Sequence, residues 1–401
     1  MKKRIGLFLD TEKTSGGAFQ DALYTIQNLK KFNKSGIEFV LLAPNLETKE
    51  TMYEGFKVIK LKFNYLRKLI CFLRANNYFV QRLKKRFFFK NYLEQIITKY
   101  EIDLVLFLNP SQYVQYLENT NYIITIPDVC HRKNSEFPEV RNESEFEIRE
   151  DIFKKYLPKS YAVITNSELI KKDIVKFYNV DEKRIIIVSH QPSSQILNFK
   201  HDLEKEIKII KKYNLPKFFF FYPAQYWSHK NHIYLVDGLE VALKELKFEI
   251  SAVFCGSDKG NLNFVKNYCE RKKLNDKILF LDFVEDHEIP YLYKLSNAIV
   301  MPTYFGPTNL PLLEAFQMGV PVIYSNFSDF KKEFENSVLY SDLNDPSSLA
   351  KNLKELSENT KLRQELIEEG KKKVSNLMSK KTFMNLFNLF EEYFKIQSRW
   401  K

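Results

Sequence analysis

Short apolar runs alternate with helical patterns along almost the whole chain, and this alternation restricts the possible folds more than any other feature. Strands separated by helices are typical of βαβ units, in which neighbouring strands run parallel. The strands predicted in the first half are Arg4–Leu9, Ile37–Ala43, Lys57–Leu61, Leu104–Leu108, Tyr122–Ile126, Tyr161–Thr165 and Arg184–Val188. Those predicted in the second half are Phe218–Tyr222, Glu249–Cys255, Lys277–Leu281, Ala298–Met301 and Val320–Tyr324. The sequence therefore predicts two doubly wound α/β domains, each with its own sheet.

A polar, Lys-rich stretch at 198–214 separates the two series of strands and runs into Asn214-Leu215-Pro216, which is typical of a domain boundary. The length of 401 residues also fits two domains. We therefore divide the chain into an N-terminal domain at 1–200 and a C-terminal domain at 201–380. Residues 381–401 form one further helical segment, and its apolar face predicts that it packs back on the N-terminal domain.

Composition and local patterns exclude several classes of protein. The four cysteines are far apart and form no Cys-x-x-Cys pair, which argues against a zinc ribbon or a disulfide scaffold and fits a reducing compartment. The apolar run at Ile5–Leu9 is too short for a signal peptide, and no stretch of about 18 apolar residues is present to span a membrane. No Asp-x-Asp triad follows a strand, so we expect neither a metal nor another cofactor. The net charge of +12 favours a partner that carries phosphate groups or a membrane surface.

The segment Pro302–Ile323 is the most informative, because it follows a predicted strand and opens a helix. Thr308 or Asn309 can cap this helix, and Pro311 suits its first turn. The free amides and the dipole of such a helix favour an anion such as a diphosphate. Glu314, about one turn into the helix, can accept hydrogen bonds from sugar hydroxyls. The alternative is an ordinary strand–loop–helix unit with a surface glutamate.

Four blocks of sequence carry a resemblance to a known family. They are Tyr161-Ala-Val-Ile-Thr-Asn166-Ser167, Phe220-Phe-Tyr-Pro223-Ala-Gln225-Tyr-Trp-Ser-His229-Lys230-Asn231-His232, Ile299-Val-Met-Pro302-Thr, and Leu310-Pro-Leu-Leu-Glu314-Ala with Gly319-Val-Pro-Val-Ile. In this order and spacing they resemble the retaining glycosyltransferases of family four, also described as glycosyl transferases group 1. The resemblance covers nearly the whole chain. It implies the GT-B fold, in which two doubly wound Rossmann-like domains face a central cleft.

The resemblance implies a GDP- or UDP-linked sugar donor bound mainly by the C-terminal domain, and an acceptor bound by the N-terminal domain. Lys230 and Glu314 are then expected to be catalytic: Lys230 would stabilise the charge on the departing diphosphate, and Glu314 would hold the donor. The expected donor-binding residues are Gly16, Gly17, Gln225, His229, Lys230, Phe305, Gly306, Pro307, Thr308, Asn309, Leu310 and Glu314. Without the resemblance, the simplest interpretation of Lys230 is a solvated side chain in a loop, and that of Gly16-Gly17 is a turn.

Two positions depart from the usual pattern of the family. Gly306 stands where a glutamate is usual, eight residues before Glu314, and Gln225 stands where an arginine is usual, five residues before Lys230. Lys230 must then neutralise the diphosphate with less help, to which a neighbouring histidine can contribute. These departures leave open a non-catalytic paralogue that binds a nucleotide sugar or a partner glycosyltransferase.

The loop after the strand at Tyr122–Ile126 supplies candidate residues for the acceptor side. Many members of the family have a His-Asp pair here; Asp128 matches the aspartate, whereas Pro127 replaces the histidine and His131 can reach the same cleft. The pattern Asp-x-x-His-Arg with a later Phe137-Pro-Glu139 resembles a subgroup of the family. We expect Asp128 and His131 to be catalytic, although His131 can also be read as a satisfied loop histidine. The expected acceptor-side residues are Gly17, His131, Arg132 and Arg149.

Residues 55–93 contain eleven Lys or Arg residues, several aromatic residues, and no Asp or Glu. This window predicts contact with an anionic membrane surface, because each basic residue near anionic lipid contributes about 1 kcal/mol and apolar side chains can insert. A nucleic-acid-binding α/β protein is an alternative, because cations follow phosphates and aromatic rings stack on bases. A solvated helix packed on the sheet is a third explanation. The membrane explanation is favoured, because members of the family often use lipid-linked acceptors.

Together these features predict a retaining, metal-independent hexosyltransferase of mannosyltransferase type. It would act in the synthesis of a surface polysaccharide, such as lipopolysaccharide, or of a glycolipid, with a saccharide or lipid-linked acceptor. Attack by the acceptor hydroxyl from the front face of the sugar is the simplest mechanism, because no carboxylate in the matched motifs is an obvious nucleophile. We expect the protein in the cytoplasm, peripheral on the inner face of the cytoplasmic membrane.

Overall fold

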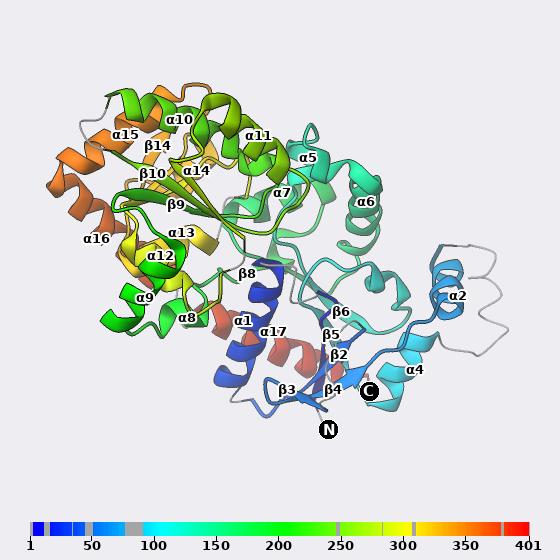
Figure 1. Cartoon of the computed structure of the whole chain (residues 1–401). Helices are drawn as coiled ribbons and strands as arrows, with labels where there is room; N and C mark the ends of the chain where they lie inside the picture. Colours follow the sequence, from blue (N-terminus) through cyan, green and yellow to red (C-terminus); the bar gives the residue numbers. More distant parts are fainter. Residues whose placement is uncertain are drawn as a thin grey trace. The chain divides into compact units, whose positions relative to one another are not determined.

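The computed structural model of the chain describes residues 3–11, 17–33, 35–44, 51–76, 91–245, 249–282, 284–306, 310–377 and 381–400. These residues form two compact α/β units (Figure 1). The first unit contains Met1–His131, Glu143–Ser189 and Lys380–Lys401, and the second contains Arg132–Asn142 and His190–Ser379.

The border between the units differs from the predicted one. It lies after Ser189 rather than after residue 200, and the segment 132–142 belongs to the second unit. One contact that holds this segment is the hydrogen bond from Lys133 Nζ to Asp329 Oδ2, at 3.0 Å. The two residues are 196 positions apart, so no local pattern in the sequence reveals that they meet.

A mostly parallel sheet forms the centre of the first unit. Its strands are β1 (Arg4–Phe8), β2 (Glu38–Ala43), β3 (Met52–Tyr53), β4 (Phe56–Lys60), β5 (Leu104–Phe107), β6 (Asn121–Thr125), β7 (Ala162–Thr165) and β8 (Ile185–Ile187). Their order is β3-β4-β2-β1-β5-β6-β7-β8, and neighbouring strands are parallel except for β3 and β4. The predicted strands of the first half are confirmed; the short antiparallel strand β3 was not predicted.

Helices cover both faces of this sheet, because each strand buries alternate side chains on opposite sides. One apolar cluster joins Leu7 of β1 to α1 (Gly17–Phe32) and α17 (Lys381–Gln397). A second cluster joins Phe8 of β1 to α4 (Tyr92–Lys99), α6 (Glu145–Tyr156) and α7 (Glu168–Tyr178). Further helical segments are α2 (Tyr65–Asn76), η2 (Gln112–Tyr116), α5 (Cys130–Lys133), η4 (Asn142–Ser144) and η5 (Glu182–Arg184).

The last helix, α17, completes the core of the first unit. Phe390 is fully buried, and its ring lies 6.0 Å from that of Phe39 on β2. Tyr393 adds a polar link, because its hydroxyl donates a hydrogen bond to the carbonyl of Asp103 at 2.8 Å. The residues of α17 that pack against the first unit are those that the sequence pattern places on the apolar face of this helix.

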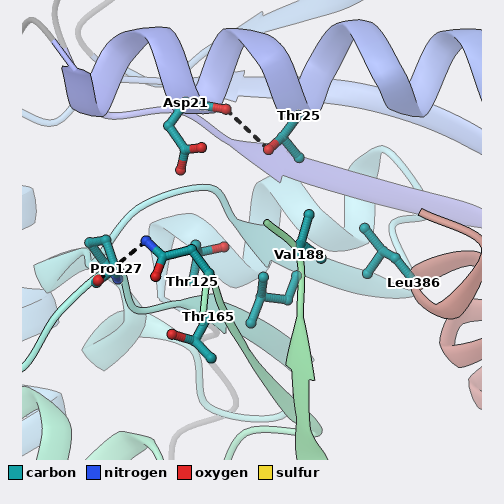
Figure 2. Close-up of a pocket in the computed structure, with 9 residues that line it drawn as sticks. Asp21, Thr25, Thr125, Pro127, Thr165, Val188 and Leu386 are labelled. Carbon is teal, nitrogen blue, oxygen red and sulfur yellow. Dashed lines mark hydrogen bonds between the residues drawn. The ribbon is translucent and has the colours of Figure 1, made fainter. Parts of the chain in front are cut away.

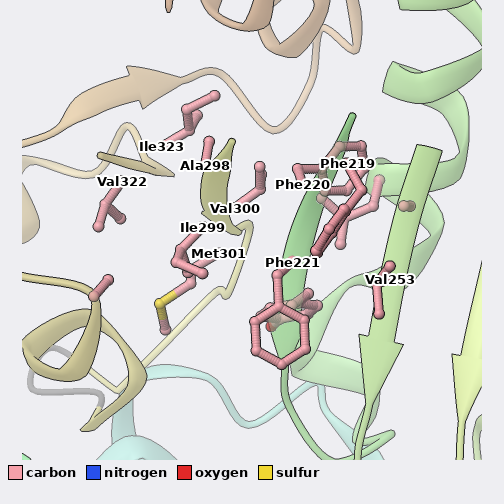
Figure 3. Packing of buried hydrophobic residues seen from close by; sticks show 14 of the residues in the cluster. Phe219, Phe220, Phe221, Val253, Ala298, Ile299, Val300, Met301, Val322 and Ile323 are labelled. Carbon is pink, nitrogen blue, oxygen red and sulfur yellow. The ribbon is translucent and has the colours of Figure 1, made fainter. Parts of the chain in front are cut away.

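A fully parallel sheet forms the centre of the second unit. Its strands are β9 (Phe219–Pro223), β10 (Ser251–Cys255), β11 (Ile278–Leu281), β12 (Ala298–Met301), β13 (Val322–Ser325) and β14 (Leu339–Ser341), in the order β11-β10-β9-β12-β13-β14. Figure 3 shows Phe219, Phe220 and Phe221 of β9 among the side chains of the neighbouring strands, and each is at most 1% exposed. A continuous apolar run is typical of a parallel strand covered on both faces.

Helical segments accompany this sheet along the chain. They are η3 (Pro138–Val140), α8 (Ser194–Leu197), α9 (Leu203–Tyr213), η6 (Ser228–Lys230), α10 (His232–Glu245), α11 (Leu262–Lys272), α12 (Ile289–Leu295), α13 (Leu310–Met318), α14 (Ser328–Phe334), α15 (Ser347–Glu358) and α16 (Thr360–Leu377). The two doubly wound α/β units predicted from the sequence are therefore confirmed.

The strand order also shows where each unit can bind a ligand. In the second unit, β10 and β11 lie on one side of β9, whereas β12, β13 and β14 lie on the other. The direction of winding therefore reverses between β9 and β12, and ligands of open α/β sheets bind beyond the carboxyl ends of the strands at such a point. In the first unit the same reversal occurs between β1 and β5.

Candidate functional site

The carboxyl ends of β9 and β12 carry the two loops that the sequence motifs single out. β9 continues through residues 224–227 into η6 and α10, and β12 continues through residues 302–306 toward α13. A backbone hydrogen bond joins the loops, because the amide of Tyr304 donates to the carbonyl of His229 at 3.0 Å. The two predicted donor-site segments therefore form one site at the switch point of the second unit.

Lys230 ends η6 and is partly buried in this site. Its carbonyl accepts a hydrogen bond from the hydroxyl of Tyr222, in the buried strand β9, at 2.9 Å. Asn231 follows with a φ of 54°, a left-handed conformation that turns the chain into α10. Burial lowers the pKa of Lys230 to about 8, although the charge of Glu139 acts in the opposite direction. Lys230 is thus still mainly protonated at pH 7, and an anion bound beside it would raise its pKa again.

His229 links three segments of the second unit. Its ring stacks on Phe305, with 3.9 Å between the ring centroids and 16° between the planes. Its backbone amide donates to Glu139 Oε1 at 2.8 Å, and its Nδ1 is hydrogen-bonded to the same oxygen. Since a carboxylate only accepts hydrogen bonds when ionised, this contact places the proton of the neutral ring on Nδ1. The bond lowers the pKa of Glu139, against the raising effect of its burial.

The loop after β12 is shaped by backbone contacts. Thr303 Oγ1 donates to the carbonyl of Phe305 at 2.8 Å, and the hydroxyl of Tyr324 donates to the carbonyl of Gly306 at 3.0 Å. Gly306 has a φ of 92°, which side-chain-bearing residues rarely adopt. A glutamate at this position would therefore be strained in the loop conformation found here. Pro307, Thr308 and Asn309 lie outside the described residues.

Glu314 lies in α13, which begins at Leu310 with Pro311 in its first turn. One carboxylate oxygen accepts from the hydroxyl of Tyr293 at 2.8 Å, and the other accepts from the amide of Ser193 at 3.3 Å. Burial raises its pKa, and these two hydrogen bonds oppose the increase. Both oxygens thus have protein partners, which holds the carboxylate in one orientation.

Gln225 occupies the position where the family pattern usually has an arginine. Its Nε2 donates to Ser257 Oγ at 3.0 Å, and its Oε1 accepts from the indole N–H of Trp227 at 3.1 Å. The amide is therefore engaged on both sides and carries no charge. Lys230 is the cationic residue that this loop itself contributes to the site.

The predicted acceptor-side residues of the first unit form a charged pair beside a buried histidine. Arg149 NH1 donates to Asp128 Oδ1 at 3.0 Å, and each of these side chains is about 30% exposed. Burial alone would raise the pKa of Asp128, but the charge of Arg149 and a hydrogen bond from the amide of Cys130 bring it below the usual value. Arg132 is partly buried in α5 and belongs to the second unit.

His131, which the sequence analysis expects to be catalytic, is buried in the first unit. Its side chain is 0% exposed, and Nε2 lies 3.0 Å from Glu150 Oε1 and 2.8 Å from the hydroxyl of Tyr178. The rings of Phe146 and Phe153 pack around it. Burial lowers the pKa of His131. Nε2 of His131 thus has two partners, whereas its buried Nδ1 has none among the described residues, and the ring packs in the core of the first unit.

Two polar groups at the switch point of the first unit were not predicted from the sequence. Asp10 follows β1, and its Oδ2 accepts from the hydroxyl of Ser111 at 2.5 Å. Asn109 follows β5 and donates to Thr11 Oγ1 at 3.3 Å. Burial raises the pKa of Asp10 to about 6. The position of Asp10 at the end of an apolar run was the only signal for it in the sequence. Its burial could not be predicted, because it depends on the segment of β5 and Ser111 that packs beside β1.

A small cavity lies beside the same edge of the first unit (Figure 2). Asp21 and Thr25 of α1 face it from one side, and Thr165 at the end of β7 faces it from the other. Asn166 also lines it. Its volume is about 10 Å³, which is room for about one water molecule. Gly17 begins α1, whereas Gly16 lies outside the described residues.

The basic window can be described only in part, because residues 77–90 lie outside the described residues. Helix α2 belongs to the described part, and its large apolar side chains point outward. Those at least 40% exposed are Tyr65, Leu66, Leu69, Ile70, Phe72 and Leu73. In the part of the chain that the structure describes, no helix is both long and apolar enough to cross a membrane.

Comparisons of sequence agree with the motifs. Residues 204–373 match the family described as "Glycosyl transferases group 1". Over 214 residues, 53% of this chain and 56% of the relative, the chain is 22% identical to "O-antigen chain mannosyltransferase B" of Escherichia coli. Over 239 residues, 57% and 56% of the two chains, it is 26% identical to the "UDP-Gal:alpha-D-GlcNAc-diphosphoundecaprenol alpha-1,3-galactosyltransferase" of the same species. The matched part spans about half the length of these curated relatives.

Comparisons of structure extend over the whole chain and show its fold. A glycosyltransferase from Rickettsia africae aligns with a TM-score of 0.68 and 19% identity, covering 98% of this chain and 97% of that one. HepE of Anabaena, solved with UDP and glucose, aligns with a TM-score of 0.69 and 14% identity, covering 99% and 100%. Both units thus have the architecture of GT-B glycosyltransferases. Within this architecture, the second unit contains the segment, residues 204–373, that matches the glycosyl transferases group 1 family.

Proposed function

We propose that the protein is a retaining glycosyltransferase that moves a hexose from a nucleotide-diphospho-sugar to a hydroxyl of a saccharide or lipid-linked acceptor. One observation carries the proposal: Lys230, His229 and the Phe305–Gly306 loop meet at the switch point of the unit that matches the family. The names of relatives, which include O-antigen mannosyltransferases and a galactosyltransferase, support a role in surface polysaccharide synthesis. Solved structures of similar fold contain UDP or UDP-glucose, which supports a nucleotide-sugar donor.

The proposed reaction breaks the bond between the anomeric carbon and the phosphate oxygen and forms a bond from that carbon to the acceptor oxygen. The charge that develops on the departing diphosphate is stabilised by Lys230. The acceptor proton passes to the departing phosphate oxygen, and attack occurs on the face that the diphosphate leaves. Glu314 supports this route, because both of its oxygens are held by Tyr293 and Ser193. We propose that the reaction needs no metal.

We further propose that the protein works at an anionic membrane surface, where a lipid-linked acceptor would be found. Helix α2 supports this proposal, because its exposed apolar side chains lie in a window without any acidic residue. Arg67 and Lys68, on the same helix, are exposed as well. Apolar side chains that insert between lipids, combined with cations near their headgroups, are what interfacial helices use to bind anionic membranes. Nucleic-acid binding by this window is the competing explanation.

The first experiment is thermal unfolding with a panel of nucleoside diphosphates and nucleotide sugars. A ligand at about 100 times its dissociation constant should stabilise the protein by about 2.7 kcal/mol, which raises the melting temperature by several degrees. The shift should appear with one base and be lost in Lys230→Ala. Lys244→Ala is the matched control, because Lys244 is exposed at the end of α10 and contacts Glu240 rather than the site.

The same experiment distinguishes two hypotheses, an active transferase and a non-catalytic paralogue that binds a nucleotide sugar. A shift with one nucleotide, together with sugar transfer to an acceptor, supports the transferase. A shift without transfer to any acceptor of a broad panel supports the non-catalytic paralogue. If no nucleoside diphosphate shifts the melting temperature, the hypothesis that the site around Lys230 binds a nucleotide-sugar donor is wrong.

A further inference from the structure

Glu139 has one oxygen fully engaged and the other buried without a partner. It lies in η3, within the segment 132–142 of the second unit. Oε1 accepts both hydrogen bonds from His229. Oε2 is inaccessible to solvent and has no hydrogen-bond partner among the described residues, and the side chain as a whole is 8% exposed. In the described part of the chain, no other carboxylate oxygen is buried in this way.

A buried acceptor without a donor is unfavourable, because it has lost its water without gaining a replacement. Such groups are rare in folded proteins, and one at a candidate site suggests that a ligand completes the hydrogen bond. An ionised carboxylate can only accept, so the ligand must bring a donor. A phosphate group does not meet this need, because its oxygens are acceptors and its charge repels the carboxylate.

The neighbours of Glu139 indicate which donor fits. Lys230, the proposed diphosphate partner, follows His229 directly and responds electrostatically to Glu139. On the other side of Lys230, Asn231 Nδ2 is a buried donor that has no partner among the described residues. An unused acceptor and an unused donor beside a phosphate-binding lysine match the hydroxyl groups of a carbohydrate, which both donate and accept.

The position of Glu139 also matches the course of the reaction. When the diphosphate departs, positive charge develops on the transferred sugar, and a nearby carboxylate stabilises it. A carboxylate facing the ribose would give no such benefit. Gly306 follows Phe305, whose ring stacks on His229, and has no side chain that could contact the sugar. Glu139 supplies a carboxylate beside His229 from another segment of the chain.

We propose that Glu139 is a donor-sugar-binding residue whose Oε2 accepts a hydrogen bond from a hydroxyl of the transferred sugar. Its Oε1 fixes the Nδ1–H form of His229, and the stacked His229 and Phe305 rings hold the carboxylate in place. This inference rests on the proposed function, because it assumes that Lys230 binds the donor diphosphate.

The test compares Glu139→Gln with the unmodified protein by calorimetric titration of the nucleoside diphosphate and of its sugar conjugate. The variant keeps the size of the side chain but removes the charge. Affinity for the diphosphate alone should change less than about twofold, whereas affinity for the nucleotide sugar should fall about tenfold, the loss typical of one charge-assisted hydrogen bond. The turnover number should fall as well. Glu136→Gln is the control, because Glu136 is exposed in the same segment.

Deoxy analogues of the donor provide a second measurement that does not depend on how the variant folds. With the unmodified protein, removing one hydroxyl of the transferred sugar should lower the affinity about tenfold. In Glu139→Gln the same removal should have little further effect, because the two changes delete one interaction.

Two results would overturn the inference. One is an equal loss of affinity for the diphosphate and its sugar conjugate in Glu139→Gln, which would mean that Glu139 only positions His229 or contacts the ribose. The other is a series of deoxy sugars that all bind the unmodified protein as tightly as the intact donor. Failure of the proposed function looks different, because the unmodified protein would then bind no nucleoside diphosphate at all.

Discussion

The titratable side chains of the two units differ in how far they are buried, and burial affects whether a ligand can contact them. His131 and Asp128 stand three residues apart, yet His131 is fully enclosed whereas Asp128 remains partly exposed beside Arg149. Lys230 is partly buried, and Glu139, whose side chain is 8% exposed, is hydrogen-bonded to the neighbouring His229. A group of this kind responds strongly to a bound charge, because few water molecules screen it.

Asp10 gives a prediction at the residue scale. Burial raises its pKa to about 6 from the usual 3.8, so the folded state binds the proton more tightly than the unfolded chain. The stability that the protonated group contributes is complete below about pH 4 and is lost as pH rises through 6. Asp10→Asn imitates the protonated form. We expect it to unfold like the unmodified protein near pH 4 and to be more stable by about 2–3 kcal/mol at pH 7.

Denaturant unfolding of both proteins at intervals between pH 4 and pH 8 measures this difference. Asp181→Asn serves as the control, because Asp181 is exposed at the start of η5. Parallel stability curves for Asp10→Asn and the unmodified protein would contradict the assignment.

At the scale of single elements, α2 differs from the other helices of the first unit in the direction of its apolar face. In α1 and α17 the apolar side chains are buried against the sheet. In α2, Cys71 is buried whereas Leu66 and Ile70 are 61% and 46% exposed. The hydrophobic pattern is similar in each case, so the pattern alone does not show which face turns inward.

We expect the double variant Leu66→Ser with Ile70→Ser to bind anionic vesicles at least tenfold more weakly, because inserted side chains contribute in proportion to the apolar area they bury. Stability should change little, since these side chains are already exposed. Sedimentation with vesicles of phosphatidylglycerol and phosphatidylcholine measures the effect. Leu203→Ser is the matched control, because Leu203 in α9 is also 61% exposed.

The vesicle experiment also decides between the competing explanations of the basic window. Unchanged binding by the double variant would contradict a docking role for α2. Salt-sensitive binding to oligonucleotides, without binding to anionic vesicles, would favour the nucleic-acid reading.

At the scale of the whole molecule, the chain builds two separate cores and returns to the first one at its end. The apolar cluster of the second unit contains residues from Ile196 to Val374, whereas α17 adds Phe383, Phe390 and their neighbours to the first unit. The C-terminal segment is thus part of the core of the first unit, although it follows the second unit in the sequence.

We expect Phe390→Ala to lower the stability of the first unit by about 3–5 kcal/mol, because it removes a fully buried aromatic side chain. Nucleotide binding at Lys230 should be unchanged, since Lys230 belongs to the second unit whereas α17 is part of the core of the first. Calorimetric unfolding with and without nucleotide measures both effects. A large loss of nucleotide affinity in a folded Phe390→Ala protein would show that the two cores are coupled. Ile396→Ala, with a side chain that is 38% exposed on the same helix, is the control.

Most helices and strands, and most residues of the candidate donor site, could be predicted from the sequence. Strand lengths, helix periods and the motifs around Lys230 and Glu314 are local, and local patterns can be recognised in the sequence without knowledge of tertiary contacts. The strand order that follows from right-handed βαβ units then brings the β9 and β12 loops to one edge.

The burial of single side chains could not be predicted from the sequence, because it depends on segments that are far apart in the chain. His131 matched a catalytic pattern but is enclosed by Phe146, Phe153 and Tyr178. Glu139 belongs to the Phe137-Pro-Glu139 pattern, from which no role was predicted, and only its contact with His229, 90 residues away, places it at the candidate donor site. A residue's chemistry is visible in the sequence, whereas its solvent exposure and hydrogen-bond partners exist only once the chain has packed.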